Sequence, residues 1–213
     1  PRYDAAPFER FVREQEIGLK TRETSAGYLA WRAQAQALYP DHPFAREVTA
    51  ESLAALTPDL ARAHMRSLMR KEGLLVTAVG AITPEELAPL IDEAVAALPE
   101  TSAIPAITPV SLPEVAAADP VVVSLPQPQS LVRFIGPAMD RANADFFPAY
   151  VLNYTFGGGG FESRLMKTLR VDKGLTYGVS SSIDPNPFFT VWSGGGQTKN
   201  ESAGEFIAGI RAE

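Results

Sequence analysis

Two hydrogen-bond donors stand seven positions apart in the last quarter of the sequence. Arg170 closes a segment of helical pattern, and Tyr177 opens a strand-like segment after a short turn. A guanidinium and a phenol on two adjoining elements can both point at one carbonyl oxygen, and donors aimed at a developing oxyanion are strong catalytic devices. On the pattern alone, a surface arginine and a half-buried tyrosine explain the same two residues more simply.

A run of four glycines precedes the segment that carries the arginine. Ordering glycine costs conformational entropy, so the run indicates either a ligand lying close to bare backbone or a hinge between two helices. It matches neither the G-x-x-x-x-G-K-[ST] phosphate loop nor the G-x-G-x-x-G dinucleotide fingerprint, which leaves a phosphate site as the weaker alternative. The candidate substrate-binding residues are Gly157, Gly158, Gly159 and Gly160.

Other catalytic chemistry finds little support in the residue types. His42 and His64 are the two histidines, and neither has a partner at the spacing of a helical zinc pair, so we expect structural roles for both. No cysteine is present, which excludes thiol catalysis, and no G-x-S-x-G nucleophile motif occurs. Acidic residues near the N-terminus fit a solvated helix face.

Composition bounds the class of protein. With 213 residues, 46% of them hydrophobic, the chain can build one large or two small domains. A net charge of −6 without a basic cluster argues against a nucleic-acid partner. No apolar run approaches the length of a transmembrane segment. The sequence starts at Pro1 and ends inside an amphipathic pattern, so we expect a piece of a longer protein, and the missing signal peptide says nothing of localisation.

The elements that must position these residues begin with helices. Thr57 and Thr83 are each followed by proline, as expected of an N-cap with proline at the first helical position, and Glu86 is placed for a capping box. An apolar run between the two helices that they open is typical of a strand. The expected helices are 7–38, 58–71 and 85–98, and the expected strand is 74–82.

Five prolines among small residues then predict a surface linker and a domain boundary. Beyond them, Leu165, Met166 and Leu169 should point inward from a short helix, and two alternating segments should form a hairpin around the turn at 184–187. The expected domains are 1–98 and 120–213, joined by the linker 99–119. In the second domain the expected strands are 121–125, 129–139, 176–183 and 188–195, and the expected helices are 145–156 (buried), 161–170 and 201–213.

Strands and helices mix without regular βαβ alternation, which favours an α+β fold with mixed or antiparallel sheets and packed helices. One segment of the sequence also resembles a known family. The segment FGGGGFESRLMKTLRVDKGLTYGVSSSI resembles the signature of the pitrilysin/insulinase family of zinc metallopeptidases, in which a glycine-rich stretch leads into S-R-L and then R-x-x-x-G-L-x-Y. Upstream, the segment that begins YPDHPF resembles that family's turn, helix and strand in the same order.

The resemblance implies two homologous metallopeptidase-like α+β domains, the first truncated here at its N-terminus and the second at its C-terminus. In such enzymes H-x-x-E-H on a helix of the catalytic domain holds zinc, and its glutamate acts as general base. A non-catalytic unit contributes an Arg/Tyr pair and a glycine-rich loop from across a closed chamber. Arg170 and Tyr177 match that pair, and the four glycines match the loop.

This chain departs from the family's catalytic pattern because it contains no H-x-x-E-H. The spacing of Glu9 and Glu16 would make Glu16 the further zinc ligand of the family, whereas counting back from the turn at His42 places that position near Gly18. We follow the count from the turn and assign no metal ligand. The zinc is then expected in the complete enzyme or in a partner.

The resulting hypothesis is a non-catalytic, substrate-binding subunit or domain that binds a peptide together with a catalytic metallopeptidase subunit or as a homo-oligomer. One alternative is a single-chain zinc peptidase whose H-x-x-E-H precedes Pro1, with Glu16 as a ligand. Another is a structural or assembly protein of the same fold without proteolysis. Family habit favours the bacterial periplasm or envelope.

Overall fold

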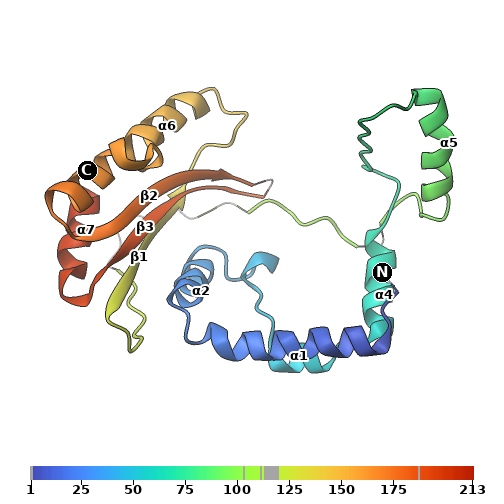
Figure 1. Ribbon diagram of the computed structural model, residues 1–213, viewed down its shortest axis with the longest axis horizontal. Coiled ribbons are helices and arrows are strands. Elements are labelled where there is room, and N and C mark those ends of the chain that lie inside the picture. The colour runs from blue at the N-terminus through green and yellow to red at the C-terminus, as the bar shows by residue number, and fades with distance from the viewer. Residues whose placement is uncertain (1, 103, 111, 113–119, 187) are drawn as a thin grey trace. The chain divides into compact units, whose positions relative to one another are not determined.

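The computed structural model describes residues 2–102, 104–110, 112, 120–186 and 188–213. Parts of the expected linker and Pro187 of the expected turn lie outside these residues. The chain is α+β, as predicted, with helices and a three-stranded antiparallel sheet (Figure 1). It divides into two compact units, Pro1–Gly18 with Val48–Ala106 and Leu19–Glu47 with Ile107–Glu213. The two homologous domains and their boundaries stay a prediction.

Local capping signals set the helices of the first unit. The Thr57 hydroxyl accepts the N–H of Leu60 at 3.1 Å, and Thr83 and Glu86 form the expected capping box, with Glu86 accepting the N–H of Thr83 at 2.9 Å. These bonds satisfy N–H groups that a helix start leaves unpaired. The helices in or entering this unit are α1 (Ala5–Arg22), α3 (Ala50–Ala54), α4 (Pro58–Leu68) and α5 (Pro84–Val95).

Two predicted strands are wrong. Residues 74–82 and 121–125 carry no strand, and their apolar side chains are exposed, to 99% at Val79 and 83% at Val122. An apolar run becomes a strand only when another strand pairs with its backbone. Among the described residues, the paired strands are those of the sheet in the second unit.

The segment 7–38, predicted to be helical, consists of two helices, α1 and α2 (Ala26–Leu38). Ser25 breaks the run because its hydroxyl accepts the N–H of Tyr28 at 3.3 Å and caps α2. The second helix leads into η1 (Pro43–Ala45), and together they bury Ala35 and Leu38 against Ile135 of the sheet. His42 is 8% exposed and lies beside the rings of Tyr39, Phe44 and Phe188.

The sheet of the second unit has the strand order β1-β3-β2. The hairpin of β2 (Thr176–Pro185) and β3 (Thr190–Lys199) is confirmed, and β1 (Gln129–Pro137) pairs antiparallel with the other side of β3. The core under the sheet is also the predicted one. Leu165 and Leu169 are fully buried and Met166 is 6% exposed, packed with Val179 and with Phe206 of α7 (Ala203–Ala212), which follows η5 (Asn200–Ser202).

Between β1 and β2 runs an irregular helical segment that carries the glycine run. It consists of α6 (Phe146–Asn153), the π-helical η2 (Tyr154–Gly158), η3 (Gly160–Glu162) and the π-helical η4 (Met166–Asp172). The helix expected over 145–156 exists, but the prediction that it is buried is wrong, since Phe147, Val151 and Leu152 are 62–70% exposed. The buried residues of α6 are Phe146 and Asn153, and Asn153 contacts β2 through Ser181.

Candidate functional site

Tyr177 projects from an irregularity in the edge strand β2. The pairing with β3 shifts register between Thr176 and Val179, so the backbone bulges at Tyr177. The Thr176 hydroxyl stabilises the bulge, since it accepts the N–H of Gly178 at 3.1 Å and donates to the carbonyl of Gln197 at 2.6 Å. A bulge re-aims a side chain, and Tyr177 is 88% exposed rather than half-buried. Within the described part of the chain, its phenol has no hydrogen-bond partner.

Arg170 is half-buried in η4 and lies against an aromatic ring. Its guanidinium carbon is 4.5 Å from the ring centroid of Phe161, the residue that follows the glycine run. No hydrogen bond or ion pair joins the guanidinium to any described side chain, so its N–H donors are available to a ligand. No such contact links Arg170 to Tyr177 either, and their convergence on one oxygen stays a prediction.

A small hollow adjoins Tyr177 where the three strands meet. It is a shallow, open depression with a volume of about 280 Å³. The lining carries no charge and combines hydrogen-bonding side chains with two glycines: Gln129, Thr176, Tyr177, Gly178, Gly196 and Gln197. Such a lining suits uncharged groups that can donate or accept hydrogen bonds, as the backbone and small side chains of a peptide do.

The glycine run has a structural requirement that the sequence did not reveal. A Cβ on Gly157 would lie 2.5 Å from the hydroxyl of Ser181 in β2, and one on Gly159 would lie 2.7 Å from the carbonyl oxygen of Tyr154. Gly158 is similarly close to Asn153, whereas Gly160 adopts a φ of +64°. At Gly157 the helix can therefore approach β2 only as bare backbone, whereas Gly158 and Gly159 are packed closely against residues of their own helical segment. Gly158 and Gly160 are nevertheless exposed, and their contact with a substrate stays a prediction.

Sequence reasoning missed a buried polar network beneath these glycines. The side-chain oxygen of Asn153 accepts hydrogen bonds from the Ser181 hydroxyl at 2.7 Å and from the Trp192 indole at 2.9 Å. Its amide nitrogen donates to the carbonyl of Ser181 at 3.3 Å. The network joins α6, β2 and β3. The sequence indicated this network only through Asn153, whose amide side chain lies within the apolar helical segment 145–156.

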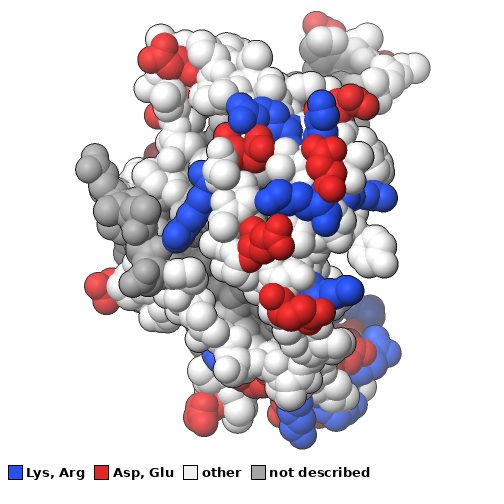
Figure 2. Space-filling view, turned by 90° about the vertical axis from the view of Figure 1, so that its left-hand side faces the viewer, with Lys and Arg blue, Asp and Glu red and all other residues white. Residues whose placement is uncertain are grey.

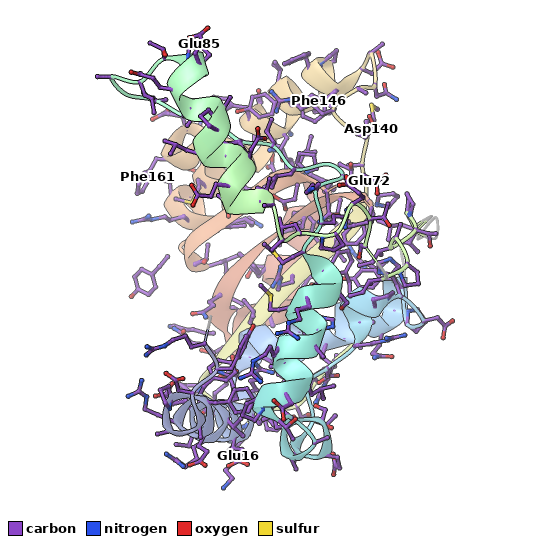
Figure 3. The ribbon with its side chains drawn as sticks, turned by 90° about the vertical axis from the view of Figure 1, so that its right-hand side faces the viewer. Glu16, Glu72, Glu85, Asp140, Phe146 and Phe161 are labelled. Atoms are coloured by element: carbon purple, nitrogen blue, oxygen red, sulfur yellow. The ribbon has the colours of Figure 1, made fainter. Side chains whose placement is uncertain are left out.

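The described residues do not fit a zinc ion. They contain no group of three or more histidine, cysteine, aspartate or glutamate side chains that could hold a metal. Glu16 is exposed on α1, and Figure 3 shows it well apart from Glu72 and Glu85 of the same unit. The ring of His42 is engaged structurally, because Nδ1 accepts the N–H of Phe44 at 3.3 Å and Nε2 lies 3.2 Å from the carbonyl of Thr108.

The charged surface of the second unit is mixed in sign. On the face in Figure 2, basic and acidic side chains alternate. The ion pairs of this unit include Arg164 with Glu213 at 2.8 Å and Lys173 with Glu205 at 3.5 Å. No helix in the described ranges is both long and apolar enough to cross a membrane.

Comparison with known proteins identifies a family and a shared fold. A family model described as the peptidase M16 inactive domain matches residues 55–213. A search of curated proteins found no match.

Solved structures share the fold at low sequence identity. The crystal structure of a peptidase M16 inactive domain from Pseudomonas fluorescens superposes with a TM-score of 0.86 at 24% identity, over 100% of this chain and 51% of that one. A conserved protein from Enterococcus faecalis V583 gives 0.70 at 20%, over 98% and 49%. The periplasmic protease PqqL from Escherichia coli gives 0.70 at 19%, over 96% and 22%. The chain thus spans about half of the first two proteins.

Proposed function

Because the chain belongs to the family of M16 peptidase inactive domains, we propose that it is the non-catalytic, substrate-binding part of a zinc peptidase, in which Arg170 and Tyr177 bind an extended peptide. The match to that family confirms the resemblance to the pitrilysin/insulinase peptidases that was drawn from the motif around these two residues.

The exposure of Tyr177 carries the proposal. A tyrosine that is 88% exposed contributes little to the core, and Tyr177 lies at a bulge and lines the uncharged hollow. The guanidinium of Arg170 supplies further N–H donors, and no described side chain accepts a hydrogen bond from them. In this proposal a carbonyl oxygen of the bound peptide accepts hydrogen bonds from both residues, and such bonds would hold the substrate or polarise its carbonyl.

The zinc would be held outside the residues described here, since these do not fit it. A catalytic domain or subunit carrying H-x-x-E-H is therefore the proposed partner, and a homo-oligomer is the alternative arrangement. The periplasmic location of PqqL supports the bacterial envelope as the proposed compartment.

Peptide affinity tests the proposal. Fluorescence anisotropy would follow labelled extended peptides binding to the natural full-length protein with a catalytically inactive partner domain. Changing Arg170→Ala and Tyr177→Phe together should weaken binding at least about fivefold, since each lost donor removes a hydrogen bond of about 0.5–1.5 kcal/mol. The matched control is Arg141→Ala with Tyr150→Phe, which removes another ring-stacked arginine and another exposed phenol. Equal affinity of both double variants would refute the proposed role.

A scaffold role without proteolysis is the second candidate, and one observation favours it. Phe147, Val151 and Leu152 expose large apolar side chains on α6, and apolar surface of this kind often marks a contact with another protein. In a scaffold, charged or polar changes at these three residues would weaken assembly while peptide affinity stayed undetectable in every variant.

A further inference from the structure

The glycine run and Arg170 are linked by one side chain. Phe161 follows Gly160 directly, and its ring lies under the guanidinium of Arg170, 4.5 Å from ring centroid to Cζ. This distance is well inside the range in which an arginine is attracted to an aromatic face. The Phe161 side chain is 63% exposed, so burial in the core does not explain its position.

A tight turn fixes the backbone on both sides of this phenylalanine. Gly160 enters the turn with a φ of +64°, which favours glycine, and its carbonyl oxygen is held from the other end by Ser163. The Ser163 hydroxyl donates to that oxygen at 2.7 Å and its N–H donates at 3.1 Å. Ser163 is 1% exposed, so the turn is anchored in the interior. Phe161 therefore presents its ring from a rigid support.

Stacking of this kind orients a guanidinium without using its donors. The guanidinium carbon lies over the ring, and this attraction to the aromatic face uses none of the N–H groups as hydrogen-bond donors, so they remain able to bind an oxygen acceptor. An unsupported arginine would lose more side-chain entropy on binding, because its long side chain samples many rotamers.

We infer that Phe161 is a positioning residue: it holds the Arg170 guanidinium over its ring, in the orientation that binds a peptide carbonyl. This inference rests on the proposed peptide-binding function. It also assigns the end of the glycine run a role, because the turn at Gly160 and Ser163 sets where the ring lies.

A double-mutant cycle tests the inference. Peptide affinity would be measured in the natural full-length protein for Phe161→Leu, Arg170→Ala and their combination. Loss of one exposed cation–π contact should weaken binding about two- to fivefold in Phe161→Leu. Phe161→Tyr, which keeps the aromatic face, should restore the wild-type affinity. In the Arg170→Ala background, Phe161→Leu should have no further effect.

The control is Phe147→Leu, which changes a phenylalanine of similar exposure, 65%, on α6 and should leave affinity unchanged. Thermal unfolding of each variant reports whether the fold is intact. Two outcomes overturn the inference alone: Phe161→Leu binds as wild type while Arg170→Ala weakens binding, or Phe161→Leu weakens binding equally with and without Arg170. Unchanged affinity in Arg170→Ala would instead refute the arginine's part in the proposed function.

Discussion

Asn153 and Ser181 are joined by a buried hydrogen bond of 2.7 Å, donated by the serine hydroxyl to the amide oxygen. The two residues lie 28 positions apart, on α6 and on β2. A Cβ on Gly157 would meet the same hydroxyl at 2.5 Å. The hydrogen bond therefore depends on glycine at position 157, because a side chain there would push Ser181 and β2 away from the helix that carries Asn153.

Removal of the Asn153 side chain should destabilise the protein. Asn153→Ala leaves the Ser181 hydroxyl and the Trp192 indole N–H without their buried acceptor, and unsatisfied buried groups cost about 1–3 kcal/mol each. We expect the free energy of unfolding to fall by about 2–4 kcal/mol in urea titrations. The exposed Asn143→Ala is the control. Equal unfolding midpoints for the two variants would contradict the network's stabilising role.

A methyl group added to the glycine run should lower the free energy of unfolding measured in the same urea titrations. Gly157→Ala forces the helix and β2 apart, and overpacking of this kind costs about 1–3 kcal/mol. Gly136→Ala on β1 is the matched control, because nothing lies within 4 Å of its added Cβ and the substitution should change stability by less than about 0.5 kcal/mol. If Gly157→Ala were as stable as the control, the close approach would have no energetic consequence.

Acid should weaken the attachment of the last helical turn of α7. The Thr168 hydroxyl and then the Arg164 guanidinium donate to the carboxylate of Glu213, each at 2.8 Å, and lower the pKa of Glu213. Because the folded pKa lies below the unfolded one, this stabilisation is present above the unfolded pKa and is lost as pH falls through the folded pKa.

Melting temperature measured from neutral to acidic pH would show this loss. Glu213→Gln should be less stable than wild type at neutral pH and nearly equal to it in acid. A constant difference between the two proteins across the whole pH range would count against the carboxylate's contribution.

Alkali should act at Tyr28 of α2 in the opposite sense. Burial, and then the hydrogen bond that its phenol donates to Glu47, raise the pKa of Tyr28 above 10.0. Since the phenol ionises more readily in the unfolded chain, its contribution is present below the unfolded pKa and is lost as pH rises through the folded pKa. Ultraviolet titration, taken as the difference from Tyr28→Phe, should show a late transition that moves to lower pH in Glu47→Gln. An unmoved transition would exclude Glu47 as a cause.

Local signals predicted much of this structure. Thr57 and Thr83 cap helices because a cap depends on the next three residues, and Leu165, Met166 and Leu169 are inward because helical spacing places them on one face. The hairpin of β2 and β3 follows from alternation around a short turn. These features depend on residues that are close in sequence.

Features that depend on distant partners were not predictable in the same way. Residues 74–82 have the composition of a strand, but pairing is decided by another segment, and among the described residues none pairs with them. The close approach of Gly157 to Ser181 and the contact of Arg170 with Phe161 likewise depend on how the chain folds, which the local sequence pattern does not reveal. The motif identified Arg170 and Tyr177, whereas the bulge that exposes Tyr177 became visible only in the register of β2 and β3.

Direct contact between Tyr177 and the peptide is the central claim, and photo-crosslinking measures it most directly. With p-azidophenylalanine introduced at position 177 of the natural full-length protein, illumination should attach a bound extended peptide at that position. The same photoreactive residue in place of Tyr150, an exposed tyrosine on α6, should attach no peptide. Equal labelling at the two positions, or none at 177 under conditions where the peptide binds, would contradict the proposed site.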